Sequence, residues 1–424
     1  MPLKTQTEKG HLAGLAIGGH VPAFAEPLHV GRPSVGNQER LMKRIRDVIE
    51  SRWFSNNGPN VQEFEREAAR FLGVRHFIAM CNGTIALEIA IRAAGLRGEV
   101  IVPSFTFVAT AHSLQWQEIT PVFCDIDPRT HNIDPKQVEN LITPRTTGII
   151  GVHLWGRPCD VEALEEIARR RALGLLFDAA HAFGCSSRGT MIGNFGRAEV
   201  FSFHATKFLN TFEGGAVSTN DDELAGRIRL MKNFGFAGYD NVIYPGTNGK
   251  MTEISAAMGL TGLESINEFV ATNRLNHETY RSELADLPGI AVAEYDSSEK
   301  CNYQYVILEV DERAAGLTRD ELISILHAEN VLARRYFFPG CHRMEPYRSH
   351  FPNAHLMLPH TTTLARRVLA LPTGSAVSAR QISVICRILK TALKNPTATR
   401  SVLSRNQPVD SEQLECLVTT STSL

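Results

Sequence analysis

The sequence predicts an α/β protein with a mostly parallel β-sheet, followed by a smaller α+β domain. Between residues 75 and 220, short apolar runs alternate with amphipathic helical patterns. Continuous apolar runs of this length are typical of parallel strands buried on both faces. After residue 270 this alternation stops, and helices and strands follow in a mixed order. The 424 residues, 43% of them hydrophobic, are enough for a large core.

The strands of the parallel sheet are expected where β-rich apolar runs occur. These runs are Glu99–Val102, Pro121–Asp125, Gly148–Val152, Gly174–Phe177, Val200–Phe203 and Gly215–Thr219. Helical patterns lie between most of them, at Thr84–Ala94, Phe107–Trp116, Pro135–Leu141, Val161–Arg171 and Asp222–Asn233. Ligands bind beyond the carboxyl ends of such strands. The candidate site residues are therefore those just after the runs: Asp178, Ser202, His204 and Lys207.

The second half of the chain predicts the smaller domain. Its expected elements are helices at Asn273–Ala285, Arg319–Glu329 and Ser378–Leu393, with strands at Gly289–Ala293, Tyr303–Val310 and Val331–Phe338. Residues 1–25 and 396–424 lack periodicity, so we expect flexible terminal segments. The large domain then spans residues 26–270 and the small domain residues 271–395.

Composition excludes several classes of protein. Basic and acidic residues number 44 and 45, so the charge balance favours neither nucleic acid nor a membrane surface as a partner. The eight cysteines form no CxxC pair, and we expect neither a metal site nor a disulfide framework. No run approaches the about 18 apolar residues of a membrane helix. The apolar run at residues 12–17 is too short for a signal peptide, so we expect a cytoplasmic protein.

A glycine-containing turn precedes the first expected helix of the sheet region. Asn82, Gly83 and Thr84 stand at its start. Glycine lets a ligand approach the backbone, and free N–H groups at a helix N-terminus bind anions. Taken alone, the same residues are more often an ordinary helix N-cap.

An aspartate ends the fourth apolar run, in the segment Phe177-Asp178-Ala179-Ala180-His181. A carboxylate there can pair with a cationic ring nitrogen of a cofactor. A turn or capping aspartate is equally common at the end of a strand.

A lysine leaves the next apolar run in the segment Phe201-Ser202-Phe203-His204-Ala205-Thr206-Lys207. A lysine in a partly buried pocket can have a lowered pKa and bond covalently to an aldehyde. Ser202 and Thr206 offer hydroxyl groups to a phosphate. For any single lysine, a solvated loop position is the more common alternative. The order and placement of the three features at strand ends favour one shared site.

Nine segments in order resemble the DegT/StrS-type sugar aminotransferases, a fold-type-I family that depends on pyridoxal 5′-phosphate. The resemblance covers residues 30–390. Its segments are SRWFSNNGPNVQEFE (51–65), CNGTIALEIA (81–90), VIVPSFTFVAT (100–110), PVFCDIDPRTHNIDP (121–135), VHLWGRP (152–158), FDAAHAFG (177–184), FSFHATKFLNTFEGG (201–215), GTNGKMTEISAAMG (246–259) and RRYFFPGCHRMEPYR (334–348). The resemblance implies a seven-stranded, mostly parallel sheet in the large domain.

The resemblance also implies roles for individual residues. Lys207 would hold the cofactor and move protons, and Asp178 would pair with the pyridine nitrogen. His181 would lie near the ring hydroxyl and Phe107 would stack on the ring, although Phe107 alone reads equally well as a core aromatic. The phosphate contacts would be Gly83, Thr84, Ser202 and Asn248, with Asn248 supplied across a homodimer interface.

The expected reaction is transfer of an amino group from an amino acid, L-glutamate in similar enzymes, through the pyridoxamine form of the cofactor. The resemblance implies a nucleotide-linked deoxysugar as acceptor, because the family mostly aminates keto groups on such sugars. SFHATK, the Asn56–Pro59 loop and RRYFFPGCHRMEPYR are similar to members that act at sugar C4. We therefore expect a dTDP-4-keto-6-deoxyhexose. Candidate substrate contacts are Asn57, His204, Arg334, Tyr336 and His342, and a surface basic cluster is the alternative for the C-terminal ones.

Three alternatives stay open from the sequence. The first is amination at sugar C3, and the second is a keto-inositol acceptor. The third is a non-catalytic regulatory protein that keeps its cofactor. A dehydrating relative carries histidine in place of the lysine, so Lys207 argues against that reaction.

Overall fold

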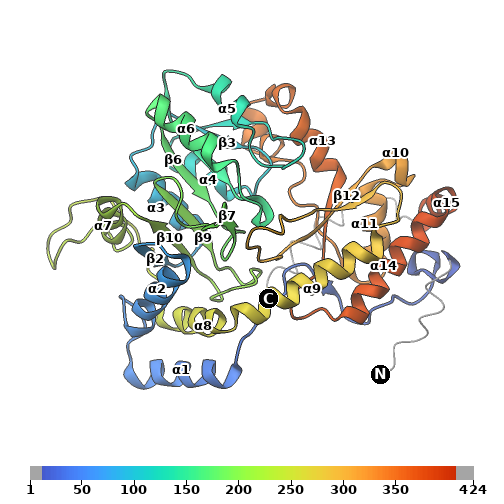
Figure 1. The fold of residues 1–424 in the computed structure, drawn as a ribbon, viewed down its shortest axis with the longest axis horizontal. Helices are drawn as coiled ribbons and strands as arrows, with labels where there is room; N and C mark the ends of the chain where they lie inside the picture. The colour runs from blue at the N-terminus through green and yellow to red at the C-terminus, as the bar shows by residue number, and fades with distance from the viewer. Residues whose placement is uncertain (1–11, 407–424) are drawn as a thin grey trace.

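A computed structural model of the chain describes residues 12–406. Figure 1 shows a large domain built around an extended sheet and, beside it, a smaller domain that contains α9 (Ile266–Leu284), α11 (Arg319–Ala328) and α14 (Ala379–Lys394). The α/β fold class with a smaller C-terminal α+β part is therefore confirmed.

The large domain contains a seven-stranded sheet in the order β2-β10-β9-β6-β5-β3-β4. Its strands are β2 (His76–Met80), β3 (Glu99–Pro103), β4 (Thr120–Cys124), β5 (Thr146–Val152), β6 (Gly174–Asp178), β9 (Ala198–Ser202) and β10 (Gly215–Thr219). Strand β10 is antiparallel to both of its neighbours, and the other pairs are parallel. The predicted, mostly parallel sheet is confirmed.

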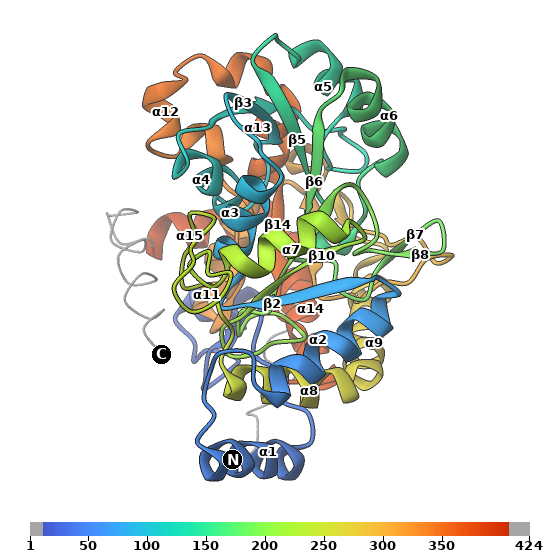
Figure 2. The same cartoon turned by 90° about the vertical axis from the view of Figure 1, so that its left-hand side faces the viewer.

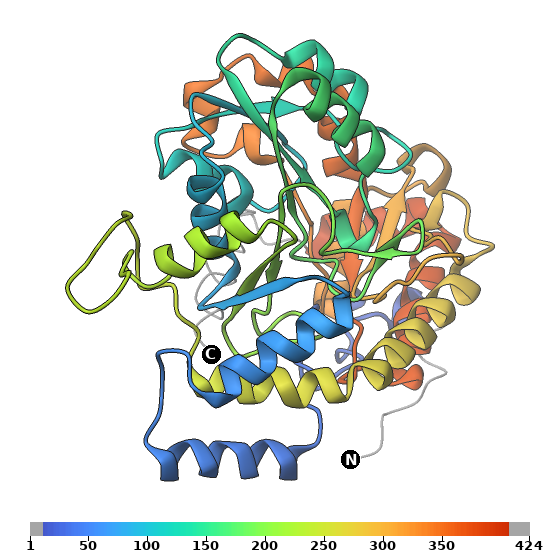
Figure 3. The same ribbon diagram turned by 60° about the vertical axis from the view of Figure 1, so that its left-hand side comes forward.

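Alternate side chains of the strands point to opposite faces, and helices cover both faces. Val100, Ile150 and Leu176 pack with α3 (Gly83–Ala93), α4 (Ala109–Gln115) and α7 (Asp222–Met231). The opposite face is covered by α2 (Pro59–Leu72), α5 (Pro135–Leu141), α6 (Val161–Arg171) and α8 (Glu253–Glu264). Figures 2 and 3 show these layers, with α1 (Gln38–Ser51) lying outside them below α8. Burial on both faces explains why the strands are continuous apolar runs.

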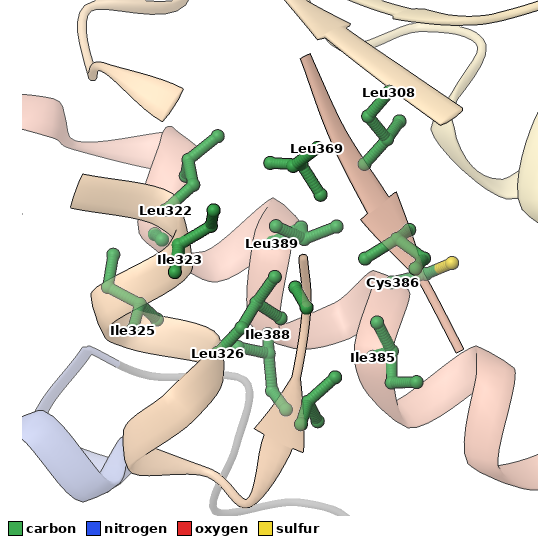
Figure 4. Packing of buried hydrophobic residues seen from close by; sticks show 14 of the residues in the cluster. Leu308, Leu322, Ile323, Ile325, Leu326, Leu369, Ile385, Cys386, Ile388 and Leu389 are labelled. Atoms are coloured by element: carbon green, nitrogen blue, oxygen red, sulfur yellow. The ribbon is translucent and has the colours of Figure 1, made fainter. Parts of the chain in front are cut away.

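The smaller domain is built on a three-stranded antiparallel sheet, β11 (Ile290–Val292), β12 (Val306–Val310) and β14 (Val368–Leu371). Helices α11 and α14 cover it, and their leucines and isoleucines interdigitate with Leu308 and Leu369 (Figure 4). This core is separate from the cores of the large domain.

A further strand pair ties the N-terminal part of the chain to this domain. Strand β1 (Leu28–His29) pairs in parallel with β13 (Val331–Leu332). The strand expected over residues 331–338 thus ends at Leu332, because Arg334 turns to pair with Ala370 of β14. The segment after it carries aromatic side chains toward the large domain.

The terminal segments expected to be flexible lie partly outside the described residues, at 1–11 and 407–424. Their described parts are folded instead. Leu15 and Phe24 are buried in the small-domain core, and Glu329 accepts hydrogen bonds from the main chain of Ala16 and Ala23. Residues Pro396–Asn406 form α15, with Leu403 in the same core. The apolar side chains in these segments are the physical reason. The domain boundaries remain predictions.

Candidate active site

Lys207 lies in the loop between β9 and β10, at the carboxyl edge of the sheet. Its main-chain N–H donates to the carbonyl of His204 at 2.8 Å, which closes a tight turn. The next residues, Phe208 and Leu209, are buried and fix the loop. Burial lowers the pKa of the Lys207 ammonium to about 8, while the negative charge of Asp178 acts in the opposite direction. The amine is therefore prepared to lose its proton near neutral pH.

Asp178 ends β6, two strands from β10, and its side chain is buried. Its Oδ2 accepts a hydrogen bond from Thr110 Oγ1 at 2.8 Å, and its Oδ1 accepts one from the N–H of Ala180 at 3.1 Å. Burial raises the pKa of this carboxyl, whereas these hydrogen bonds and the charge of Lys207 lower it. A buried carboxylate held in this way can pair with a cation brought by a ligand.

His181 follows in the turn after β6 and is also buried. Its Nδ1 accepts the main-chain N–H of Trp155 at 3.2 Å. Burial and the neighbouring charge of Lys207 hold the pKa of His181 well below its usual value. Asp178, His181 and Lys207 thus form one electrostatic group. Position at a strand end pointed to Asp178 and Lys207, and the family resemblance pointed to His181.

A candidate anion-binding cradle lies at the start of α3. The Asn82 side chain caps the helix by accepting the N–H of Ile85 at 2.8 Å. A Cβ placed on Gly83 would lie 3.1 Å from the Cβ of Ser202, and one on Gly215 would collide with the main chain of Asn82 and Gly83. Glycine is therefore needed for this close approach. It brings the helix N-terminus, with Thr84, against Ser202, and N–H groups at such an N-terminus attract phosphate.

Two further predicted cofactor residues are exposed. Phe107 precedes α4 and is 56% exposed, with its ring 6.4 Å from that of Phe337. Phe337 in turn stacks on the His181 ring at 5.8 Å. Asn248 is exposed as well, and its carbonyl oxygen lies 3.9 Å from the Sγ of Cys81, next to the cradle.

The candidate substrate residues divide into two groups. One group lies near the lysine or the aromatic rings. His204 is in the same loop as Lys207, and Arg334 and Tyr336 are in the segment that follows β13. His204 is exposed, with its Nε2 3.4 Å from Glu213. The guanidinium of Arg334 lies over the Tyr336 ring at 5.4 Å, and that ring is 5.2 Å from Phe337.

The remaining two lie in different surroundings. Asn57 stands in the loop before α2 with positive φ, and its carbonyl accepts from Gln62. His342 is only 2% exposed, with its Nδ1 2.7 Å from the hydroxyl of Ser104. Burial lowers the pKa of His342 to about 4. Its neighbour Cys341 belongs to a core of the large domain. The role of His342 as a substrate contact stays a prediction: Asp178 and His181 are similarly buried, and the Nε2 of His342 has no hydrogen-bond partner among the described residues.

Several residues of the site escape prediction from the sequence. Thr110 and Phe337 fall within segments that resemble the family, but nothing in those segments singles them out. Trp155 contributes its main chain, and Asn302 and Tyr305 come from the small domain. Their contacts depend on how the two domains meet, and no local pattern reports that.

Two negative findings apply to residues 12–406. Within this range, no group of three or more histidine, cysteine, aspartate or glutamate residues is arranged to hold a metal ion. No helix in the same range has the length and apolar composition needed to cross a bilayer.

Comparison with known proteins yields a consistent set of relatives. Residues 36–390 match the DegT/DnrJ/EryC1/StrS aminotransferase family. The dTDP-4-amino-4,6-dideoxy-D-glucose transaminase of Shigella dysenteriae is 40% identical over 315 residues, which cover 74% of this chain and 85% of the relative. The GDP-perosamine synthase of Caulobacter vibrioides is 37% identical over 324 residues, covering 76% of this chain and 86% of that protein.

Two solved structures also resemble this chain in fold and sequence. The crystal structure of DesI in the presence of its TDP-sugar product has a TM-score of 0.88 and 50% identity, covering 92% of this chain and 99% of DesI. The structure of DesV from S. venezuelae in complex with a ketimine intermediate has a TM-score of 0.76 and 30% identity, covering 88% and 96% of the two chains.

Proposed function

This chain belongs to the DegT/DnrJ/EryC1/StrS aminotransferase family, and from that premise we propose how its candidate site works and on what. The chain is a sugar aminotransferase. Its cofactor is proposed to be pyridoxal 5′-phosphate, with Lys207 as the residue that bonds to it and Asp178 as the partner of its ring nitrogen. Asp178 ends β6 and Lys207 follows the neighbouring parallel strand β9, and this placement at one edge of the sheet is the observation that carries the proposal. The charges of the two side chains influence each other's pKa.

The residues present fit this cofactor. The close approach of Gly83 to Ser202, at the N-terminus of an eleven-residue helix, provides a place for a phosphate. The buried carboxylate of Asp178 provides the anion that a protonated pyridine ring requires. When bound, the cofactor supplies an electron sink for the bond changes at the amino carbon. Phe107 is proposed to cover one face of its ring.

The side chains of this chain would handle protons and charge. Lys207, with a pKa lowered to about 8, can accept a proton near neutral pH and return it at a neighbouring carbon. Thr110 and the N–H of Ala180 keep the Asp178 oxygens in fixed positions. His181 stays neutral beside Lys207, so that it adds no competing positive charge.

The acceptor is proposed to be a dTDP-linked 4-keto-6-deoxyhexose, which would be converted to a 4-amino-4,6-dideoxy sugar with L-glutamate as donor. The Shigella transaminase and the TDP-sugar product in DesI support this choice. The similarity to a GDP-perosamine synthase keeps a GDP-linked sugar as the nearest alternative. The proposed substrate contacts are His204, Arg334, Tyr336 and Asn57.

A homodimer is proposed, in which Asn248 reaches the phosphate site of the neighbouring subunit. The exposure of Asn248 supports this arrangement. So does the loop between α7 and α8, which projects from the body of the molecule in Figures 1 and 3. It exposes apolar side chains that a monomer would leave in water: Phe234, Phe236, Tyr239, Val242 and Ile243. A cytoplasmic location also stays a proposal.

The test separates the two half-reactions. Protein loaded with pyridoxal phosphate is mixed with L-glutamate, and loss of the visible cofactor band reports the donor step. The resulting amine form is then offered the dTDP-4-keto, GDP-4-keto and 3-keto deoxysugars and a keto-inositol, with products identified by mass. We expect the dTDP-4-keto sugar to be aminated fastest. Preference for another acceptor would overturn the substrate assignment, and no turnover despite bound cofactor would favour a regulatory protein.

A further inference from the structure

His181 belongs to the large domain, but the two aromatic rings that contact its imidazole come from the small domain. The Tyr305 ring lies 4.8 Å from the His181 ring at 60°. On another side, the Phe337 ring stacks at 5.8 Å with an interplanar angle of 3°. Tyr305 directly precedes β12, and Phe337 follows β13. The imidazole therefore contacts two aromatic rings that the small domain supplies.

One small-domain side chain fixes the main chain of the same turn. Asn302 is fully buried, and its Nδ2 donates to the carbonyls of His181 at 2.8 Å and Phe183 at 3.1 Å. Its Oδ1 accepts the N–H of Gln304 at 3.0 Å. Both donors of the amide group and its oxygen are thus engaged, which leaves the side chain a single orientation.

The hydrogen bond at Nδ1 decides where the His181 proton sits. Trp155 presents a main-chain N–H to Nδ1 at 3.2 Å, and an N–H can only donate. A neutral imidazole that accepts at Nδ1 carries its proton on Nε2. The titratable groups that face the ring are Lys207 and Tyr305, and neither supplies a negative charge at neutral pH.

We propose that Asn302 is a positioning residue: by holding the 181–183 turn, it keeps His181 as a neutral imidazole with its proton on Nε2. The inference rests on the proposed function in one respect only, namely that Nε2–H faces the ring oxygen of the cofactor. The Asn302 bonds, the Trp155 bond and the two ring contacts are properties of the chain itself. The small domain thereby determines which ring nitrogen of His181, in the large domain, carries the proton.

Two variants and a matched control test this role. Asn302→Asp keeps the shape and the acceptor for Gln304 but removes both donors, and Asn302→Ala removes the whole amide. The control is Asn276→Ala, because Asn276 is also a buried small-domain amide. Its Nδ2 donates to Thr373 at 3.3 Å and to Gly374 at 3.1 Å. A loss that arises only from general destabilisation should appear in the control as well.

The readout is the nitrogen NMR spectrum of full-length protein labelled in histidine, first without and then with pyridoxal phosphate. The signal of His181 is assigned by its loss in His181→Asn. We expect a neutral ring protonated on Nε2 between about pH 6 and about pH 9 in the unchanged protein. In both Asn302 variants the ring should exchange between tautomers, and the affinity for pyridoxal phosphate should fall about tenfold. The Asn276 control should retain both properties.

A proton on Nδ1, or a charged ring at neutral pH, would contradict the inference in the unchanged protein, whatever the variants do. So would Asn302 variants with an unaltered His181 signal. If unchanged protein shows the expected tautomer but does not bind pyridoxal phosphate, the proposed function fails and the positioning role of Asn302 stands.

Discussion

The hydroxyl of Thr110 donates a hydrogen bond to Oδ2 of Asp178 at 2.8 Å, and both side chains are buried. The bond joins α4 to the end of β6, so the helix on one face of the sheet orients the carboxylate at its edge. Thr106 lies 3.1 Å from the same hydroxyl and extends the polar chain. Asp178 thus has few conformations open to it.

Removing this hydroxyl should weaken the site without unfolding the protein. In Thr110→Val the pKa of Asp178 should rise, because the Thr110 bond lowers it. We expect the affinity for pyridoxal phosphate to fall by about 1–1.5 kcal/mol, or about tenfold, the usual effect of one such bond. Thr110→Ser keeps the hydroxyl and should bind within about threefold of the unchanged protein. Equal affinities for the valine and serine variants would remove Thr110 from this role.

The lowered pKa of Lys207 predicts a specific pH dependence. Below about pH 8 the amine is protonated and cannot attack an aldehyde, and above it the amine is free. The rate at which cofactor-free protein captures pyridoxal phosphate should therefore rise up to about pH 8 and then level off. An ordinary lysine would have its midpoint at about pH 10.4. Because the Asp178 charge raises this pKa, Asp178→Asn should move the midpoint to lower pH. A midpoint near that of free lysine would contradict the effect of burial.

A buried ion cluster stabilises the large domain away from the chemistry. Glu65 accepts from Lys232 at 3.0 Å, from Arg229 at 2.8 Å and from the N–H of Ala79 at 2.9 Å. Glu65→Ala leaves the buried Lys232 ammonium without its carboxylate partner, and we expect the free energy of unfolding to fall by about 3–5 kcal/mol. Glu67→Ala, on the exposed side of the same helix, should cost about 0–1 kcal/mol. Denaturant titration measures the free energy of unfolding of both variants. Similar losses in the two would show that the cluster does not stabilise the domain.

Arg334 should affect the reaction with the keto sugar and not the reaction with L-glutamate. Its exposed guanidinium beside Tyr336 can attract an anionic acceptor, whereas the donor step needs no nucleotide contact. Arg334→Ala should raise the KM for the keto sugar about tenfold and leave the half-reaction with L-glutamate within about twofold. Arg129, which is exposed in the loop after β4, gives the control Arg129→Ala. Equal effects on both half-reactions would show that Arg334 is not a specific contact of the keto sugar.

The sequence predicts the sheet well because strands that are buried on both faces are continuous apolar runs in the sequence. The runs that contain Ile101, Ile149 and Leu175 are continuous and apolar, and each is a strand in the structure. Strand β2 was not predicted, although His76–Met80 is similarly apolar, because it follows α2 without a preceding strand to set an alternating pattern.

The residues at strand ends were also predictable, and those contributed by packing were not. Asp178 and Lys207 are named by position alone. By contrast, Asn302 reaches His181 from 121 positions along the chain, and no spacing rule connects them. The same holds for His342, because only the packed structure shows that its ring bonds to Ser104.

The central claim is that Lys207 bonds to the cofactor. Protein loaded with pyridoxal phosphate is treated with borohydride, which makes the bond permanent, and is then digested and analysed by mass spectrometry. We predict one modified peptide, labelled at Lys207, and no label in Lys207→Ala. Label on Lys232 or Lys250, whose pKa values are also lowered, would contradict the account.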